Sequence, residues 1–441
     1  MGSEAIIHLF GNGPSPALAT YGLRRTVDDG EEHDPGVKEF VQRNVYVDDG
    51  LISKPTAEEV VTLVRNTPAA LASANLRPHK VVLNSVSVME AFPTEDLAKD
   101  IRSLDLHQDD LPAQRSFGVF WDQETDAFTY KLSMPDKPLT RRGVLSVVNS
   151  VYDHLGLAAP VLLQGRLLLQ QLVSMGEKKT AKAPEELSLG WKSWKNALPD
   201  LQNISIQRCY HPPQFGPVTR AELHAFSDAS QTAIGVAVYL LLFNCKEDDS
   251  VSLLFEQAKV APINPIRILR LELCGAVLAV QAVDRITEEI DMEISETVFY
   301  TDSKVVLGYC KESRRFHIYV ANRVQTITLR VPSILLIWLR ARGLHPKDLA
   351  VSSWLSGPDV LRNPSEITTL GTKQAILSPN GPELRKKLKP LTTSVRSSGS
   401  PTLGTERFKK HSSWPSLRRA IAIVIAKVKS LKERDTSDKP S

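Results

Sequence analysis

The pattern of apolar and polar positions is clearest in the second half of the chain. The elements it predicts there are, in order, strands at residues 223–228, 235–243 and 251–260, a helix from Leu271, a strand at 298–300 and a helix at 303–309. Leu273, Val277 and Val280 form the apolar stripe of the first helix. Three antiparallel strands followed by helix, strand and helix predict a mixed α/β sheet.

The first half of the chain predicts shorter elements. Residues 56–71 have apolar positions at a helical period, and Thr56 is the expected N-cap before Glu58 and Glu59. Residues 81–83 and 115–121 predict strands. Residues 44–52 form two short apolar runs that meet at Asp48-Asp49-Gly50, which predicts a β-hairpin.

The middle and the end of the chain differ in composition. Residues 140–172 are predicted mostly helical, with breaks near Gly156 and Pro160, and Trp191 and Trp194 lie one turn apart on another helix. Ser, Thr, Pro and Gly dominate residues 365–405, which predicts a linker. A basic amphipathic helix is expected at 416–432, and the tail is therefore expected to be partly disordered.

Bulk composition narrows the class of protein. A length of 441 residues predicts two to four domains. The net charge of +4 is compatible with a polyanionic partner. The four cysteines show no Cys-X-X-Cys spacing, which argues against a zinc knuckle and a disulfide framework. No apolar run approaches the roughly 18 residues of a membrane span, and no signal-peptide pattern begins the chain, so we expect a cytoplasmic or nuclear protein.

Three acidic residues are the strongest candidates for chemistry. Asp228 and Asp302 end apolar, strand-like runs, and Glu272 opens the amphipathic helix. Any one of them alone is more often a solvated residue at the end of a strand. Together, carboxylate oxygens at one sheet edge are the ligands that two Mg²⁺ ions need to cleave a phosphodiester. In this order and context, the three acids resemble the site of a ribonuclease H-like nuclease.

The hairpin adds a second resemblance. Tyr46-Val47-Asp48-Asp49 is similar to the Tyr-X-Asp-Asp turn of reverse transcriptases, although Asp-Asp-Gly alone is ordinary turn chemistry. Followed by the three acids, it indicates the pol polyprotein of a BEL/Pao-type LTR retrotransposon. The other family-like segments are 8–12, 19–24, 117–121, 139–146, 151–156, 314–316, 320–324 and 354–358.

The resemblance implies a domain order. It suggests the C-terminal part of a reverse transcriptase palm and thumb at 1–135, a helical connection at 136–215, a ribonuclease H-like domain at 216–345, and a linker and basic tail at 346–441 leading towards an integrase of which no motif is present. The connection is often filed under the name Pao retrotransposon peptidase. No Asp-Thr-Gly or Asp-Ser-Gly occurs in the chain, so we expect no aspartic peptidase activity.

The resemblance also implies roles for individual residues. Asp228 would bridge two Mg²⁺ (or Mn²⁺) ions, Glu272 would hold the ion on the leaving-group side, and Asp302 would complete the ligand set. The substrate would be an RNA–DNA hybrid or another nucleic acid, recognised through 2′-hydroxyl groups of the RNA strand. Arg314, Arg315 and Arg323 would contact its phosphates, or would form a solvated helix face. Other parts of the polyprotein are further expected partners, and a membrane is not.

This sequence departs from the family at a fourth carboxylate. The family has Asn-Pro-Ala-Asp-Leu-Ala-Ser-Arg-Gly where residues 334–343 are Ile-Leu-Leu-Ile-Trp-Leu-Arg-Ala-Arg-Gly. We hypothesise a local frameshift, because AAT CCT GCT GAT CTG GCT read one base later encodes Ile-Leu-Leu-Ile-Trp-Leu. Genomic codons for 334–339 that give the motif in no frame would contradict this. Asp348 lies beyond the matching Arg342-Gly343, so we do not expect it to replace the missing acid.

Two functional hypotheses follow. A polymerase palm needs a further Asp upstream of Asp48 and Asp49, which residues 1–47 do not supply in a suitable context, so we expect no polymerase activity from this chain alone. The first hypothesis is an enzyme that cleaves hybrids through Asp228, Glu272 and Asp302. The second is a catalytically dead, nucleic-acid-binding remnant of a transposon polyprotein, which the missing fourth carboxylate favours.

Overall fold

The computed structural model describes residues 15–30, 34–46, 49–78, 80–98, 114–116, 119–134, 136–153, 155–176, 184–264, 266–311, 316–331, 334–336, 344–349 and 352–362. All of them belong to the first of two compact units, Met1–Arg385. The predicted linker and basic helix of the tail lie outside the described residues.

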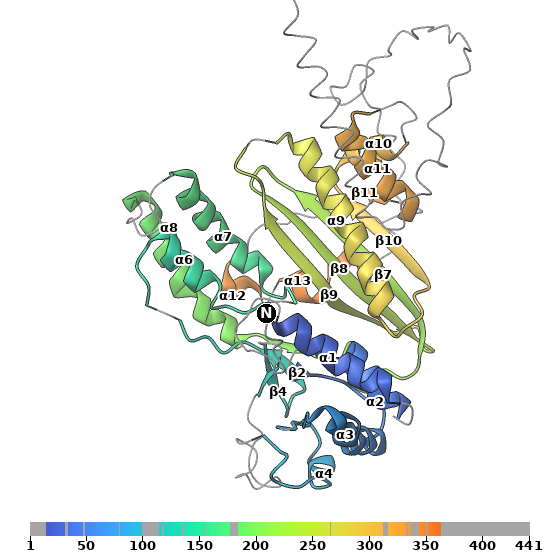
Figure 1. The fold of residues 1–441 in the computed structure, drawn as a ribbon. Helices are drawn as coiled ribbons and strands as arrows, with labels where there is room; N and C mark the ends of the chain where they lie inside the picture. Colours follow the sequence, from blue (N-terminus) through green and yellow to red (C-terminus); the bar gives the residue numbers. More distant parts are fainter. Residues whose placement is uncertain are drawn as a thin grey trace, which may run out of the picture. The chain divides into compact units, whose positions relative to one another are not determined.

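A five-stranded mixed sheet is the centre of the C-terminal half (Figure 1). Its strands lie in the order β11-β10-β7-β8-β9. Strands β7 (Val218–Ala229), β8 (Ala233–Asn244) and β9 (Asp249–Val260) pair antiparallel, whereas β10 (Glu296–Thr301) runs parallel to β7, and β11 (Ile334–Leu336) runs parallel to β10. The parallel pair needs a crossover, and helix α9 (Ile268–Glu289) supplies it.

One face of this sheet is covered by α9, α10 (Lys304–Lys311) and α11 (Ile318–Arg330). Leu223 and Ala225 of β7 both point to this face, because every second residue of a strand points to the same side of the sheet. They pack against Leu273 and Val280, two of the predicted stripe residues of α9, and against Ile327 of α11. The predicted α/β class with a mixed sheet is therefore confirmed.

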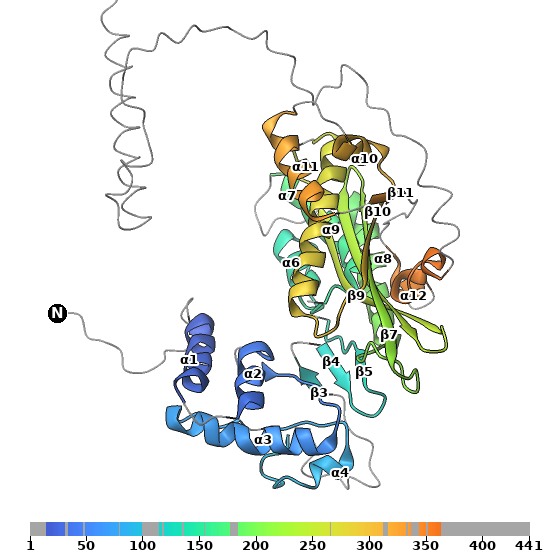
Figure 2. The same cartoon turned by 90° about the vertical axis from the view of Figure 1, so that its right-hand side faces the viewer.

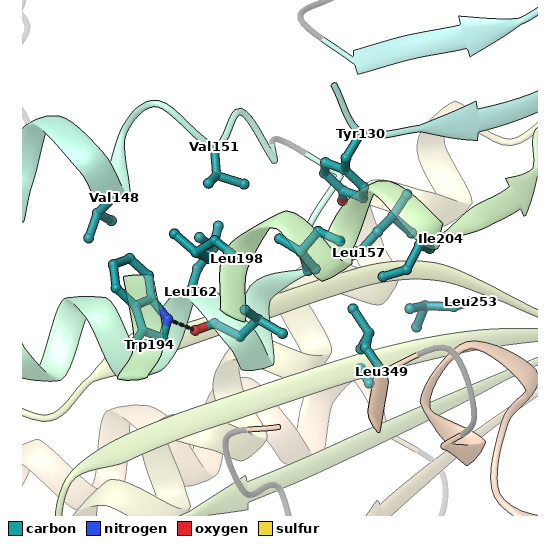
Figure 3. Close-up of a cluster of buried hydrophobic side chains, with 14 of the residues drawn as sticks. Tyr130, Val148, Val151, Leu157, Leu162, Trp194, Leu198, Ile204, Leu253 and Leu349 are labelled. Atoms are coloured by element: carbon teal, nitrogen blue, oxygen red, sulfur yellow. Dashed lines mark hydrogen bonds between the residues drawn. The ribbon is translucent and has the colours of Figure 1, made fainter. Parts of the chain in front are cut away.

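The other face carries the largest apolar cluster (Figure 3). Its cover comes from α6 (Arg141–Val148), α7 (Ala159–Ser174), α8 (Glu185–Ala197), η2 (Leu198–Asn203), α12 (Pro346–Leu349) and η3 (Asp359–Leu361). Phe226, Tyr239 and Leu253 of the sheet pack against this cover. Trp194 of α8 anchors it, since the indole is 3% exposed and its Nε1 donates to the carbonyl of Val161 at 2.9 Å. The connection and the sheet therefore share one core.

Three helices near the N-terminus pack together: α1 (Ser15–Asp29), α2 (Pro35–Arg43) and α3 (Ala57–Leu71) (Figure 2). Thr56 caps α3 as predicted, because its side chain accepts a hydrogen bond from the backbone N–H of Glu59. Strands β1 (Val45–Tyr46) and β2 (Asp49–Gly50) pair antiparallel, as the predicted hairpin requires. Arg43 bridges to Asp291 at 2.7 Å and donates to the carbonyl of Glu289, which ties α2 to the end of α9.

A second sheet of four strands has the order β3-β4-β5-β6. Its strands are β3 (Gln114–Ser116), β4 (Val119–Asp122), β5 (Ala127–Thr129) and β6 (Ser205–Gln207), all antiparallel. The single strand predicted at 115–121 is thus wrong, because the chain reverses inside it. The strand predicted at 81–83 is also wrong, since Val81 makes only an isolated bridge with Leu97 before the short helix α4 (Val86–Met89).

Of the two residues predicted to break the helical region 140–172, only Gly156 lies within the interruption between the helices. The interruption between α6 and α7 contains Gly156 at φ +83°, and its ideal Cβ would collide with the backbone carbonyl of Glu256. Pro160 instead lies in the first turn of α7, where a missing N–H costs no helical hydrogen bond. Among the helices of the described residues, none is long and apolar enough to cross a membrane.

Candidate metal centre

The two aspartates meet because their strands are parallel neighbours. In the register of β7 and β10, Ser227 lies opposite Thr301, so the next residues, Asp228 and Asp302, leave the same edge of the sheet. Carboxyl ends of parallel strands gather functional groups at one edge. The alternation of the apolar strand residues therefore positions both acids.

Glu272 reaches the same edge from above the sheet. Helix α9 begins at Ile268, earlier than predicted, and this places Glu272 after the first turn rather than at the start of the helix. Its carboxylate is hydrogen-bonded by the backbone of Ala229, next to Asp228. One ligand oxygen from each of Asp228, Glu272 and Asp302 lies within 4.8 Å of the others.

The electrostatics of this cluster oppose three simultaneous negative charges. Burial, then the charges of Asp302 and Asp228, raise the pKa of Glu272 to about 8. Burial also raises the pKa of Asp302. The Oδ1 atom of Asp302 is buried and has no hydrogen-bond partner among the described residues. A divalent cation would satisfy that oxygen and neutralise the repulsion, so the residues fit a bound divalent cation.

The raised pKa of Glu272 predicts how stability depends on pH in the metal-free protein. The folded pKa exceeds the unfolded one, so the stabilisation is full below pH 4.5 and is lost as pH rises to about 8. After discounting for the partial exposure of the side chain, we expect a loss of about 1–3 kcal/mol in unfolding free energy. Urea denaturation in EDTA between pH 4.5 and 8.5 measures it. Glu272→Gln should flatten the profile, and an equal slope in this variant would contradict the assignment.

The remaining predicted site residues are not part of this cluster. Asp49 is exposed on β2, and Asp48 lies outside the described residues. Asp348 is exposed on α12 and does not belong to the three-acid group found among the described residues. The hairpin acids and the three-acid cluster are therefore linked only by their order in the sequence.

Of the three predicted arginines, only Arg323 lies among the described residues; Arg314 and Arg315 do not. The Arg323 guanidinium lies 3.7 Å from the Tyr319 ring centroid and donates to the Tyr319 carbonyl at 3.1 Å. Arg270, two residues before Glu272, lies 4.9 Å from the same ring. Sequence reasoning missed Arg270 and Tyr319, although Arg270 lies close to Glu272 in the sequence. The two arginines, Arg270 on α9 and Arg323 on α11, concentrate positive charge around the Tyr319 ring.

The strand order and the crossover helix make a mixed sheet of the ribonuclease H-like type, with three carboxylates at one edge. Residues 140–303, which include all three acids, match the family model described as Pao retrotransposon-like RNaseH-like domain. The segment is therefore a ribonuclease H-like domain of the Pao retrotransposon type, and the resemblance to a retrotransposon pol fragment with such a domain is confirmed. No curated protein matches the chain in sequence.

Several solved structures match parts of the chain at low sequence identity. The foamy viral protease–reverse transcriptase in complex with dsDNA is 15% identical, with a TM-score of 0.38 over 75% of this chain and 60% of that one. Its dRH form in complex with dsDNA gives the same TM-score and identity and is covered over 49% of its length. RNase H1 of the archaeon Halobacterium salinarum NRC-1 is 11% identical, with a TM-score of 0.18 over 27% of this chain and 85% of that one. The chain thus spans about half to three fifths of the two foamy viral chains, and similarity at this level says nothing of activity.

Proposed function

We propose that this chain is a fragment of a BEL/Pao-type retrotransposon polyprotein whose ribonuclease H-like domain cleaves the RNA strand of an RNA–DNA hybrid. One observation carries the proposal: Asp228, Glu272 and Asp302 converge at the sheet edge, and a buried oxygen of Asp302 has no partner among the described residues. The domain limits 1–135, 136–215, 216–345 and 346–441 belong to the same proposal, as does a cytoplasmic or nuclear location.

Each acid has a proposed role in holding Mg²⁺ or Mn²⁺. As the resemblance implies, Asp228 would be shared by two ions, Glu272 would hold the ion on the leaving-group side, and Asp302 would complete the ligand set. When bound, the ions would activate a water molecule and stabilise the leaving oxygen. Glu272 must lose its proton to act as a ligand, and the high pKa of its carboxyl means that binding releases a proton near neutral pH.

The arginines beside α9 are the proposed contacts to the nucleic-acid backbone. Arg270 and Arg323 both lie against the ring of Tyr319, so they would offer positive charge to a phosphate of the nucleic acid. A strand held there would run next to Glu272, because Arg270 and Glu272 belong to the same helix. Arg314 and Arg315 remain proposed contacts from sequence alone.

The test is cleavage of a labelled RNA–DNA hybrid by the purified chain in Mg²⁺ and in Mn²⁺, beside double-stranded DNA of the same sequence. We expect metal-dependent cleavage of the hybrid that Asp302→Asn abolishes. Binding of the hybrid without cleavage would favour the alternative, a catalytically dead nucleic-acid-binding remnant. If the chain neither binds nor cleaves the hybrid, both the enzyme hypothesis and the nucleic-acid-binding hypothesis are overturned.

We further expect no DNA synthesis by this chain. Asp48 and Asp49 supply one part of a polymerase site, and the sequence offers no suitable partner acid upstream. Extension of a labelled primer on an RNA template, with and without Mn²⁺, measures it. Any extension above that of an Asp49→Asn control would contradict the expectation.

A further inference from the structure

Strands β7 and β10 share a buried polar network that the proposed function does not use. The Nδ1 atom of His224 lies 2.8 Å from the hydroxyl of Tyr300, and its Nε2 atom lies 3.1 Å from a carboxylate oxygen of Glu222. All three side chains are buried. The network therefore joins the two strands inside the core, where water does not replace a lost hydrogen bond.

The hydrogen bonds of this network have a defined direction. The hydrogen bond from His224, and then the charge of Arg220 at 2.7 Å, lower the pKa of Glu222, so its carboxylate is charged and only accepts. In a neutral imidazole, Nε2 is then the donor to Glu222, and Nδ1 accepts from the hydroxyl of Tyr300. Glu222 thus fixes the tautomer of His224 that holds Tyr300.

The ring and the backbone of Tyr300 are also held by β7. The ring stacks on Phe226, which lies opposite in the strand register, with 4.4 Å between ring centroids and 11° between ring planes. The carbonyl of Tyr300 accepts a hydrogen bond from the hydroxyl of Ser227 at 3.4 Å. Three different groups of Tyr300 are therefore fixed against the neighbouring strand.

Phe226 and Tyr300 each lie two residues before an acid of the metal centre. Asp228 is still paired with Gly235 of β8, whereas Asp302 follows the last residue of β10. The neighbour of β10 on its other side is the three-residue strand β11. The position of Asp302 relative to Asp228 therefore depends on how β10 is held against β7.

Metal ligands need such a restraint, because a working site holds its ligands to within about 0.5 Å and carboxylates without an ion repel one another. We propose that Tyr300, held by His224, is a positioning residue that keeps Asp302 beside Asp228 for a divalent cation. Tyr300 acts through its strand and does not touch the ion. The inference rests on the proposed function, since it assumes a cation between these acids.

Isothermal titration calorimetry of the metal-free chain with Mn²⁺ measures the effect without cleavage, and Asp302→Asn identifies the heat of this site. Tyr300→Phe keeps the stacked ring and removes the hydroxyl. We expect its Mn²⁺ affinity to fall about 5- to 10-fold, less than the roughly 10- to 100-fold change caused by a residue that bonds a ligand directly. Cleavage of the hybrid should fall at limiting Mn²⁺ and recover at saturating Mn²⁺.

Variants of His224 test the hydrogen bond itself. His224→Leu removes the acceptor and should lower Mn²⁺ affinity as much as Tyr300→Phe does. The double variant should show no further loss, because both changes break the same interaction. His224→Asn should retain the affinity of the wild type within about 2-fold, since its amide oxygen can accept from the Tyr300 hydroxyl near the place of Nδ1.

Tyr239→Phe is the matched control for the loss of a buried hydroxyl. Tyr239 lies on β8 and donates to the carbonyl of Trp354 in helix α13 (Ser353–Ser356), not to β10. This variant should lower the melting temperature about as much as Tyr300→Phe and leave Mn²⁺ affinity within about 2-fold. A purely structural role of Tyr300 would give the same result for both variants.

Each outcome decides the inference. Wild-type Mn²⁺ affinity in Tyr300→Phe, an equal loss in Tyr239→Phe, or an equal loss in His224→Asn and His224→Leu overturns it and leaves the proposed function intact. If the wild-type chain binds no Mn²⁺ at the three acids, the inference and the metal centre of the proposed function both fail. If the wild-type chain binds Mn²⁺ with the expected order among the variants but does not cleave the hybrid, the inference stands and the proposed cleavage fails.

Discussion

Asp228→Asn should lower the rate of hybrid cleavage on the order of 1,000-fold or more, as the loss of one member of a catalytic group does. Asn keeps the size of the side chain and removes the charge that would bridge the two ions. Asp228 is the acid next to Asp302 in the strand register, and it also contributes to the raised pKa of Glu272. The pKa of Glu272 should therefore fall in this variant. Single-turnover cleavage with saturating Mg²⁺, and a pH titration of the metal-free protein, measure the two effects.

Two other acids serve as controls for this substitution. Asp284 lies on the same helix as Glu272 and bridges to Arg330 at 3.2 Å, with both side chains partly exposed. Asp284→Asn should leave cleavage within about 2-fold, since exposed pairs contribute little. Asp348→Asn tests whether an acid outside the cluster is recruited. Near-normal cleavage by Asp228→Asn, or its abolition by Asp348→Asn, would show that other acids hold the metal.

Trp194→Ala should destabilise the protein by about 3–5 kcal/mol, among the largest costs of a single substitution. The indole is 3% exposed, packs 5.7 Å from Trp191 between ring centroids, and donates to the Val161 carbonyl. It also lies directly on the bare Cα of Gly165 in α7, where any Cβ would collide with the ring. Removal leaves a cavity between α7 and α8 and loses the hydrogen bond to the Val161 carbonyl.

Urea denaturation followed by circular dichroism measures the effect. The matched control is Leu189→Ala on the same helix, because Leu189 is 79% exposed and should change the unfolding free energy by less than about 0.5 kcal/mol. If Trp194→Ala costs less than the control, the connection does not share a core with the sheet. If the substitution shifts the unfolding midpoint of helix α8 but not that of the five-stranded sheet, the connection unfolds separately from the sheet.

The sequence predicted the five-stranded sheet well because its strands are strongly patterned. Leu223 and Ala225 alternate with polar or oppositely buried neighbours on β7, and the stripe of α9 leaves few alternatives for its orientation. Once those elements are set, parallel pairing of β7 and β10 brings Asp228 and Asp302 together. The three acids were therefore predictable from residues that never touch a ligand.

Other features depend on contacts that no local pattern records. The bare backbone at Gly156 is required by Glu256, a residue far along the chain, and the reversal inside 115–121 depends on pairing of β4 with β3 and β5. Val81 has the composition of a strand residue, but a strand needs a paired neighbour, and only Leu97 reaches it.

The shared core also sets the timing of folding during synthesis. Tyr130 and Leu361 belong to the same apolar cluster, although almost the whole connection and sheet separate them in sequence. The ribosome must therefore release the chain beyond Leu361 before the second face of the sheet is sealed. Until then the part of this face around Tyr239 lacks the cover of α13, whose Trp354 carbonyl accepts a hydrogen bond from the Tyr239 hydroxyl, and a chaperone would find its binding surface there. Truncations that stop before α12 should accumulate in this unsealed form.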